Sequence, residues 1–242
     1  MMPPTDPSAA ESAGSIIAVA SVDAPPEAGT EPAPAEVMPT VPHGAAAPAR
    51  KRPKPGERRV QILHTLAAML ELPGADRVTT AALAARLEVS EAALYRHFAS
   101  KAQMFEGLIE FIETSVFTLI NQIHERELRP TVQVHKMLTV LLQFAEKNPG
   151  MARLMVGDAL VFENDRLLTR MNQFFERFES QLRQSLRARA EAAGSATPTV
   201  DAQAQASVLT SFVLGRLQRY ARSGFRRVPT EHLEPALRLL VG

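Results

Sequence analysis

The chain has 242 residues, a formal net charge of +1 and no cysteine. Its length fits one good-sized domain or two small ones, and the lack of cysteine excludes disulfides and cysteine-based zinc sites. No apolar run approaches the length of a transmembrane helix. A short apolar run at 16–20 follows acidic residues, which argues against a secretory signal. These features fit a cytoplasmic protein.

The charge is unevenly distributed along the chain. The first 50 residues hold six acidic residues and one basic residue, a net charge of −5, which leaves +6 for residues 51–242. The near-neutral total therefore hides a basic remainder. A basic surface is typical of proteins that bind a polyanion such as DNA.

The N-terminal segment 1–50 is dominated by alanine and proline. It has too little periodic apolar content to offset the entropy of ordering, so we expect it to be disordered. A short basic arm follows at 51–56, with Lys51, Arg52 and Lys54. This arm is either a solubilising linker or a segment that reaches DNA phosphates or the minor groove.

Helical periodicity runs through the rest of the chain, without strand alternation, and predicts an all-α fold of about nine helices. The first runs from Glu57 to the Pro73-Gly74 stop, and two short helices lie within 79–98. The others are expected at 101–126, 131–147, 150–157, 163–192, 201–222 and 230–240. Ser100 and Gln103 form a capping box, and Pro130 ends the long helix before it.

Apolar residues at helical spacing mark the expected core faces. On the first helix these are Val60, Leu63, Leu66, Ala67 and Leu70. On the short pair they are Leu83, Ala84, Leu87, Val89, Leu94 and Phe98. On the helix at 201–222 they are Val208, Phe212, Leu217 and Tyr220.

The run from Thr79 to Lys101 has the layout of a helix-turn-helix, with the second helix starting at Ser90. We therefore assign residues 57–103 to a DNA-binding domain and 104–242 to an all-α second domain. Polar and small residues at the helix starts and along the second helix are the candidate DNA contacts. They are Thr79, Thr80, Ser90, Glu91, Ala92, Ala93, Tyr95, Arg96, His97 and Lys101.

Several of these candidates have a purely structural alternative. Thr79 is a possible N-cap, and Glu91 could simply favour the helix dipole instead of accepting from a cytosine amine. Arg96 could pair within the domain. Tyr95, His97 and Lys101 are expected at phosphates, which fix the register of the protein on the duplex.

The two long helices late in the chain carry wide apolar faces. Phe174, Phe175 and Phe178 widen one, and Phe212, Val213 and Leu217 widen the other. These faces are either core of the protomer or the interface of a homodimer built as a four-helix bundle. A homodimer is expected, because two helix-turn-helix motifs then reach major-groove faces roughly 34 Å apart.

The pattern A-x-R-L-x-V-S-x-x-x-L-Y-R-H-F-x-S-K at 84–101 resembles the TetR family. Three further stretches, M-F-E-G-L-I-E-F-I-E (104–113), E-K-N-P-G (146–150) and the run at 162–184, are similar to the SlmA group of that family. The resemblance covers about residues 57–240, and the long alanine/proline-rich N-terminus departs from it.

The resemblance implies a nucleoid-occlusion factor. Such a protein binds specific sites across the bacterial chromosome, captures the C-terminal tail of the division protein FtsZ and keeps the division ring off the nucleoid. It implies a homodimer, with more than one dimer per DNA site left open, and a nucleoid-associated location.

The resemblance also implies that the FtsZ tail lies between the helix at 101–126 and the next one. The candidate residues are Phe111, Val140, Gln143, Lys147 and Asn148. Phe111 is the expected apolar anchor, and its alternative is a core position. Leu119 stands where a basic residue is expected in this groove.

No feature of the sequence indicates an enzyme or a bound cofactor. His124-Glu125 lacks the second histidine of a zinc-protease motif, and there is no glycine-rich phosphate loop. The remaining alternative to a division antagonist is a ligand-responsive transcriptional repressor of the TetR kind. Such a repressor requires a small-molecule pocket coupled to the spacing of the two helix-turn-helix motifs.

Overall fold

The computed structural model describes residues 56–72 and 77–242. Within these residues all regular structure is helical, and nine α-helices confirm the predicted fold class. Residues from Arg59 onward form one compact unit. The predicted tail at 1–50, the arm residues Lys51, Arg52 and Lys54, and the Pro73-Gly74 stop lie outside the described residues.

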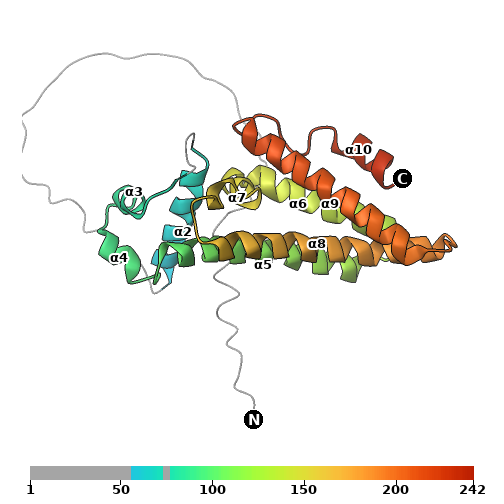
Figure 1. Ribbon diagram of the computed structural model, residues 1–242, viewed down its shortest axis with the longest axis horizontal. Coiled ribbons are helices and arrows are strands. Elements are labelled where there is room, and N and C mark those ends of the chain that lie inside the picture. The colour runs from blue at the N-terminus through green and yellow to red at the C-terminus, as the bar shows by residue number, and fades with distance from the viewer. Residues whose placement is uncertain (1–55, 73–76) are drawn as a thin grey trace, which may run out of the picture. The chain divides into compact units, whose positions relative to one another are not determined.

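The first three helices of the described chain are α2 (Glu57–Leu70), α3 (Thr80–Arg86) and α4 (Glu91–Tyr95) (Figure 1). The expected inner face is confirmed by the burial of Leu83, Ala84, Leu87, Leu94 and Phe98, whereas Val89 is half-buried. On α2 the stripe is shifted slightly. Val60 is half-buried, and Ile62, which the prediction omitted, is fully buried.

Two antiparallel helices follow, α5 (Lys101–Arg126) and α6 (Pro130–Lys147). The Ser100 hydroxyl accepts from the Gln103 N–H at 3.1 Å, and the Gln103 side chain accepts from the Ala99 N–H at 2.5 Å, so the capping box forms with its return bond one residue earlier than usual. Pro130 occupies the first turn of α6, where its missing N–H costs nothing.

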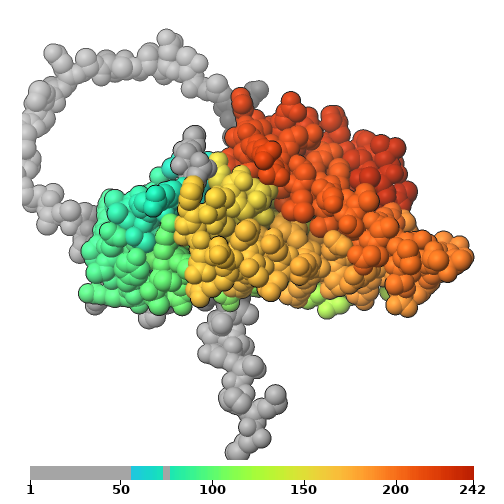
Figure 2. All heavy atoms as spheres, in the orientation of Figure 1, coloured from blue at the N-terminus to red at the C-terminus, as the bar shows by residue number. Residues whose placement is uncertain are grey.

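The C-terminal part contains α7 (Pro149–Met155), the 3₁₀ turn η1 (Asp158–Leu160), α8 (Asp165–Ala192), α9 (Pro198–Arg222) and α10 (Leu233–Leu240). The long helices α8 and α9 pack side by side, as both views show (Figures 1 and 2). None of the helices within residues 56–72 and 77–242 combines the length and apolar character that a bilayer crossing requires.

The aromatic residues of α8 and most apolar residues of α9 belong to the core of the protomer. Phe174, Phe175, Phe178, Val213 and Leu217 are buried, and Phe212 is half-buried. One expectation is wrong, because Val208 is 55% exposed and does not continue the core stripe of α9.

Candidate nucleic-acid interface and partner groove

Two hydroxyl groups hold the starts of the helix-turn-helix helices. The Thr79 oxygen accepts from the Ala82 N–H at 3.1 Å, and the Ser90 oxygen accepts from the Ala93 N–H at 3.2 Å. Both residues have the extended backbone of an N-cap. Capping uses the acceptor capacity of each oxygen and leaves its O–H able to donate to a phosphate. The structural and the DNA-binding interpretations are therefore compatible.

A side-chain hydrogen bond joins α3 to α4. The Thr80 hydroxyl donates to Oε2 of Glu91 at 2.5 Å. Both residues are predicted DNA contacts, and in the structure their hydrogen bond links the two helices. The Glu91 carboxylate therefore has a role beyond the helix dipole.

The exposed face of α4 and the residues just after it carry most of the other candidates. Ala92, Tyr95, Arg96 and His97 are exposed, and Ala93 is half-buried. Within the part of the chain that the structure describes, the Arg96 side chain forms no hydrogen bond or ion pair. The alternative in which Arg96 pairs inside the domain therefore has no support among these residues.

Lys101, which is predicted to lie at a phosphate, has an intramolecular partner. Its ammonium pairs with the carboxylate of Glu163, which lies just before α8. Two further ion pairs continue along α5 and α8, Glu106 with Arg166 at 2.8 Å and Glu113 with Arg170 at 2.5 Å. Together these three pairs form an α5–α8 ladder, which starts at the end of α5 closest to the helix-turn-helix.

The residues predicted to bind the FtsZ tail come from α5, α6 and the residue that follows α6. Phe111 is half-buried, and its ring centre lies 6.1 Å from that of Phe144 on α6. Val140, Phe144 and Lys147 are spaced to share one face of α6. Gln143 and Lys147 are exposed, so both are accessible to a partner. Phe111 combines packing against the core with an accessible edge.

Asn148 has a structural role that the sequence did not reveal. It is only 8% exposed, and its amide nitrogen donates to the Phe144 carbonyl at 2.7 Å, which satisfies a free carbonyl at the end of α6. Its second amide hydrogen and its amide oxygen are not used by this bond. Leu119, on α5, is 41% exposed.

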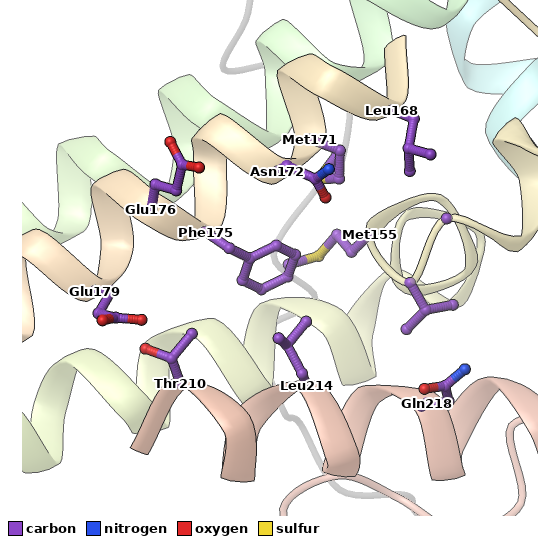
Figure 3. Close-up of a pocket in the computed structure, with 12 residues that line it drawn as sticks. Met155, Leu168, Met171, Asn172, Phe175, Glu176, Glu179, Thr210, Leu214 and Gln218 are labelled. Carbon is purple, nitrogen blue, oxygen red and sulfur yellow. The ribbon is translucent and has the colours of Figure 1, made fainter. Parts of the chain in front are cut away.

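A hollow lies between α7, α8 and α9, with a volume of about 290 Å³. Figure 3 shows Phe175 of α8 and Leu214 of α9 projecting into it, with Glu176 and Glu179 along one side. The buried Thr210 hydroxyl in its wall has no hydrogen-bond partner among the described residues. The predicted dimer residues are thus mostly core, and the open face beside them consists of this hollow and the exposed Val208, Ser211 and Gly215 of α9.

Part of this face has a signal in the sequence. Small residues recur at 204, 207, 211 and 215 of α9, a spacing of three or four that places them together on a helix. The contribution of Leu168 and Met155 to the hollow had no sequence signal, because it depends on how α7 and α8 pack.

Comparisons with known proteins agree on the family. Residues 62–108 match the model for bacterial regulatory proteins of the tetR family, and residues 129–242 match a tetracyclin repressor-like C-terminal domain of the SlmA type. The chain is 52% identical over 188 residues to the nucleoid occlusion factor SlmA of Photobacterium profundum, with 77% of this chain and 95% of that relative covered. It is 50% identical over 184 residues to SlmA of Vibrio cholerae, with 76% and 93% covered.

Solved structures match at the level of the fold. FadR from Bacillus subtilis in complex with stearoyl-CoA has a TM-score of 0.60 at 13% identity, with 75% of this chain and 97% of FadR covered. PfmR from Thermus thermophilus has a TM-score of 0.59 at 20% identity, with 76% and 95% covered.

Proposed function

The chain belongs to the TetR family and, within it, to the SlmA nucleoid occlusion factors. From this premise we propose a function for each of its parts. Helices α3 and α4 bind chromosomal sites in the cytoplasm. The groove between α5 and α6 binds the FtsZ C-terminal tail. Helices α8 and α9 hold two protomers together. Bound to the nucleoid, the protein blocks assembly of the division ring there.

The observation that supports DNA binding is the exposed polar surface of the helix-turn-helix. Thr79, Ser90, Tyr95, Arg96 and His97 all have side chains directed to solvent or partly so. The hydroxyls and cations suit phosphates, and the small Ala92 and Ala93 allow the helix to approach base edges closely. The basic arm at 51–54 adds positive charge directly before this domain.

The α8–α9 face supports the homodimer. It presents small residues on α9, an apolar hollow lined by Phe175 and Leu214, and the exposed Val208. A second copy would cover this apolar surface and give the buried Thr210 hydroxyl an opportunity to find a partner. A symmetric dimer then presents two α4 helices to successive major-groove faces.

The α5–α6 groove suits a short acidic peptide. Phe111 and Phe144 offer a paired aromatic surface for apolar side chains, and the exposed Lys147 offers a charge for acidic ones. Gln143 can bond the extended backbone of the peptide. Because Leu119 offers no charge, we expect apolar contact at that end of the groove.

DNA and the FtsZ tail are expected to reinforce each other. Helix α5 starts at Lys101, beside the helix-turn-helix, and carries Phe111 less than three turns further on. A shift of α5 on DNA binding would therefore change the groove. By linkage, any gain in tail affinity caused by DNA must be matched by an equal gain in DNA affinity caused by the tail.

The test is the binding of a fluorescent FtsZ C-terminal peptide to the full-length protein, with and without a selected DNA site, at fixed salt. Tail affinity that increases with DNA and falls at least tenfold in Lys147→Glu supports the proposal. Arg238→Glu on α10 is the matched charge control. Absence of peptide binding in both states, with DNA binding intact, would favour a ligand-responsive repressor instead.

A further inference from the structure

The recognition helix α4 has little packing of its own. It is five residues long, and Leu94 is its only buried residue. A helix this short is unstable in isolation, because nucleation of the first turn is unfavourable and too few residues follow to offset it. Its orientation must therefore be fixed by contacts at its two ends.

The N-terminal end is fixed by residues close in sequence, namely the Ser90 cap and the Thr80–Glu91 hydrogen bond. The C-terminal end is fixed from a distance. Arg59, in the first turns of α2, donates from Nη1 to the backbone carbonyl of His97 at 2.8 Å. The same guanidinium lies over the Phe98 ring, 4.0 Å from its centre.

These two contacts suit the guanidinium of an arginine better than the ammonium of a lysine. The guanidinium is planar, so it can stack on a ring and donate in its own plane at the same time. Phe98 is almost fully buried, so its ring is held in place by the surrounding core and fixes the position of the guanidinium stacked on it. The His97 carbonyl lies beyond the last helical residue and accepts the charged donor there.

We propose that Arg59 is a positioning residue for sequence recognition, which it serves by holding the C-terminal end of α4 at the angle needed for base contacts. This inference rests on the proposed DNA-reading role of α4. It assigns Arg59 an effect on the discrimination between DNA sequences, in addition to any attraction of its charge to phosphates. Those two effects respond differently to substitution.

The experiment compares Arg59→Lys with Arg86→Met, both in the full chain. Arg59→Lys keeps the charge but loses the planar stack and the fixed direction of donation. Arg86→Met removes an exposed charge at the end of α3, where the side chain has no hydrogen bond or ion pair within the described ranges. Affinity is measured for a duplex selected from a random pool and for a scrambled duplex at one salt concentration.

For Arg59→Lys we expect binding to the selected duplex to weaken about tenfold while binding to the scrambled duplex stays within about twofold, so the ratio of the two affinities falls. For Arg86→Met both affinities should fall together and the ratio should persist. Hydrogen exchange at the His97 and Phe98 amides should accelerate in Arg59→Lys only, because these amides bond to Leu94 at the end of α4.

An Arg59→Lys protein with the wild-type ratio and wild-type exchange at residues 97 and 98 would overturn the proposal, since Arg59 would then act as a charge alone. Failure of the proposed function has a separate signature. In that case the wild-type protein itself would not discriminate between the selected and scrambled duplexes.

Discussion

Gly150 on α7 lies so close to Ala67 on α2 that a Cβ added to Gly150 would stand 2.2 Å from the Ala67 carbonyl oxygen. One turn further along α7, the buried Arg153 donates to the Leu72 carbonyl at 2.7 Å. Helix α7 therefore contacts the backbone of the DNA-binding domain at two points. The E-K-N-P-G run, which resembled a family motif, ends at this close contact.

Gly150→Ala should destabilise the protein by about 2–3 kcal/mol, because the new methyl group meets backbone that cannot move without shifting a helix. Denaturant unfolding of the full chain measures this. Gly107→Ala is the matched control. There the Cβ would meet only the tips of the Leu63 side chain at 3.1 Å, which can rotate, so a loss of about 1 kcal/mol or less is expected. Equal losses would mean that the α2–α7 contact adapts easily.

Thr79→Asp should separate capping from DNA contact. Aspartate caps a helix as well as threonine does, so the unfolding free energy should change by less than about 0.5 kcal/mol. Its negative charge would repel a phosphate, so DNA affinity should fall at least about tenfold. Asn164→Asp, at the cap of α8, makes the same change of charge away from α3 and α4. If the Thr79→Asp protein bound DNA normally, Thr79 would be a cap only.

Glu127 should contribute to stability in a defined pH range. Hydrogen bonds from the Arg129 side chain at 2.9 Å and then from Lys136 at 3.0 Å lower its pKa from about 4.5 to about 2. Because the folded-state pKa is the lower one, this stabilisation is complete above about pH 4.5 and is lost as the pH falls toward 2. Glu127→Gln should therefore be less stable than wild type at pH 7, with the difference shrinking between pH 4.5 and 2. A constant difference across that range would contradict the assignment.

Gly215→Ala should distinguish an exposed helix face from a dimer interface. Among residues 56–72 and 77–242, apart from the neighbouring residues and backbone of α9 itself, no atom lies within 4 Å of the new Cβ, so alanine alone would stabilise α9 by about 1 kcal/mol. If α9 packs closely against a second copy at this face, the dimer dissociation constant should rise at least about tenfold. Sedimentation at several concentrations measures it. An unchanged dissociation constant would place the interface elsewhere.

The features predicted correctly from the sequence are those set by near neighbours in the chain. The cap at Ser100, the bounds of α5 at 101–126 and the inner face of the helix-turn-helix each depend on residues a few positions apart. Local chemistry and helical spacing are sufficient to determine such features.

The features that were missed depend on pairs distant in sequence. Glu163 pairs with Lys101 from 62 residues away, and Arg59 meets His97 from 38 residues away. Val208 had the right spacing for a core stripe, yet the helix is rotated so that this side chain is exposed. Periodicity identifies a face but not what covers it, and it cannot predict which cation meets which carboxylate.

The α5–α8 ladder has a consequence for how salt titrations of this protein are interpreted. Counterion release makes DNA affinity fall with salt in proportion to the number of phosphate contacts. The ladder pairs are partly exposed, so salt also weakens their hold on the end of α5. The slope of log DNA affinity against log salt concentration, measured on wild type, therefore contains two effects. One is counterion release from the phosphates, and the other is the weakening of the ladder ion pairs. We expect the number of phosphate contacts derived from this slope to be too high. Removing the Arg166 and Arg170 charges would show by how much.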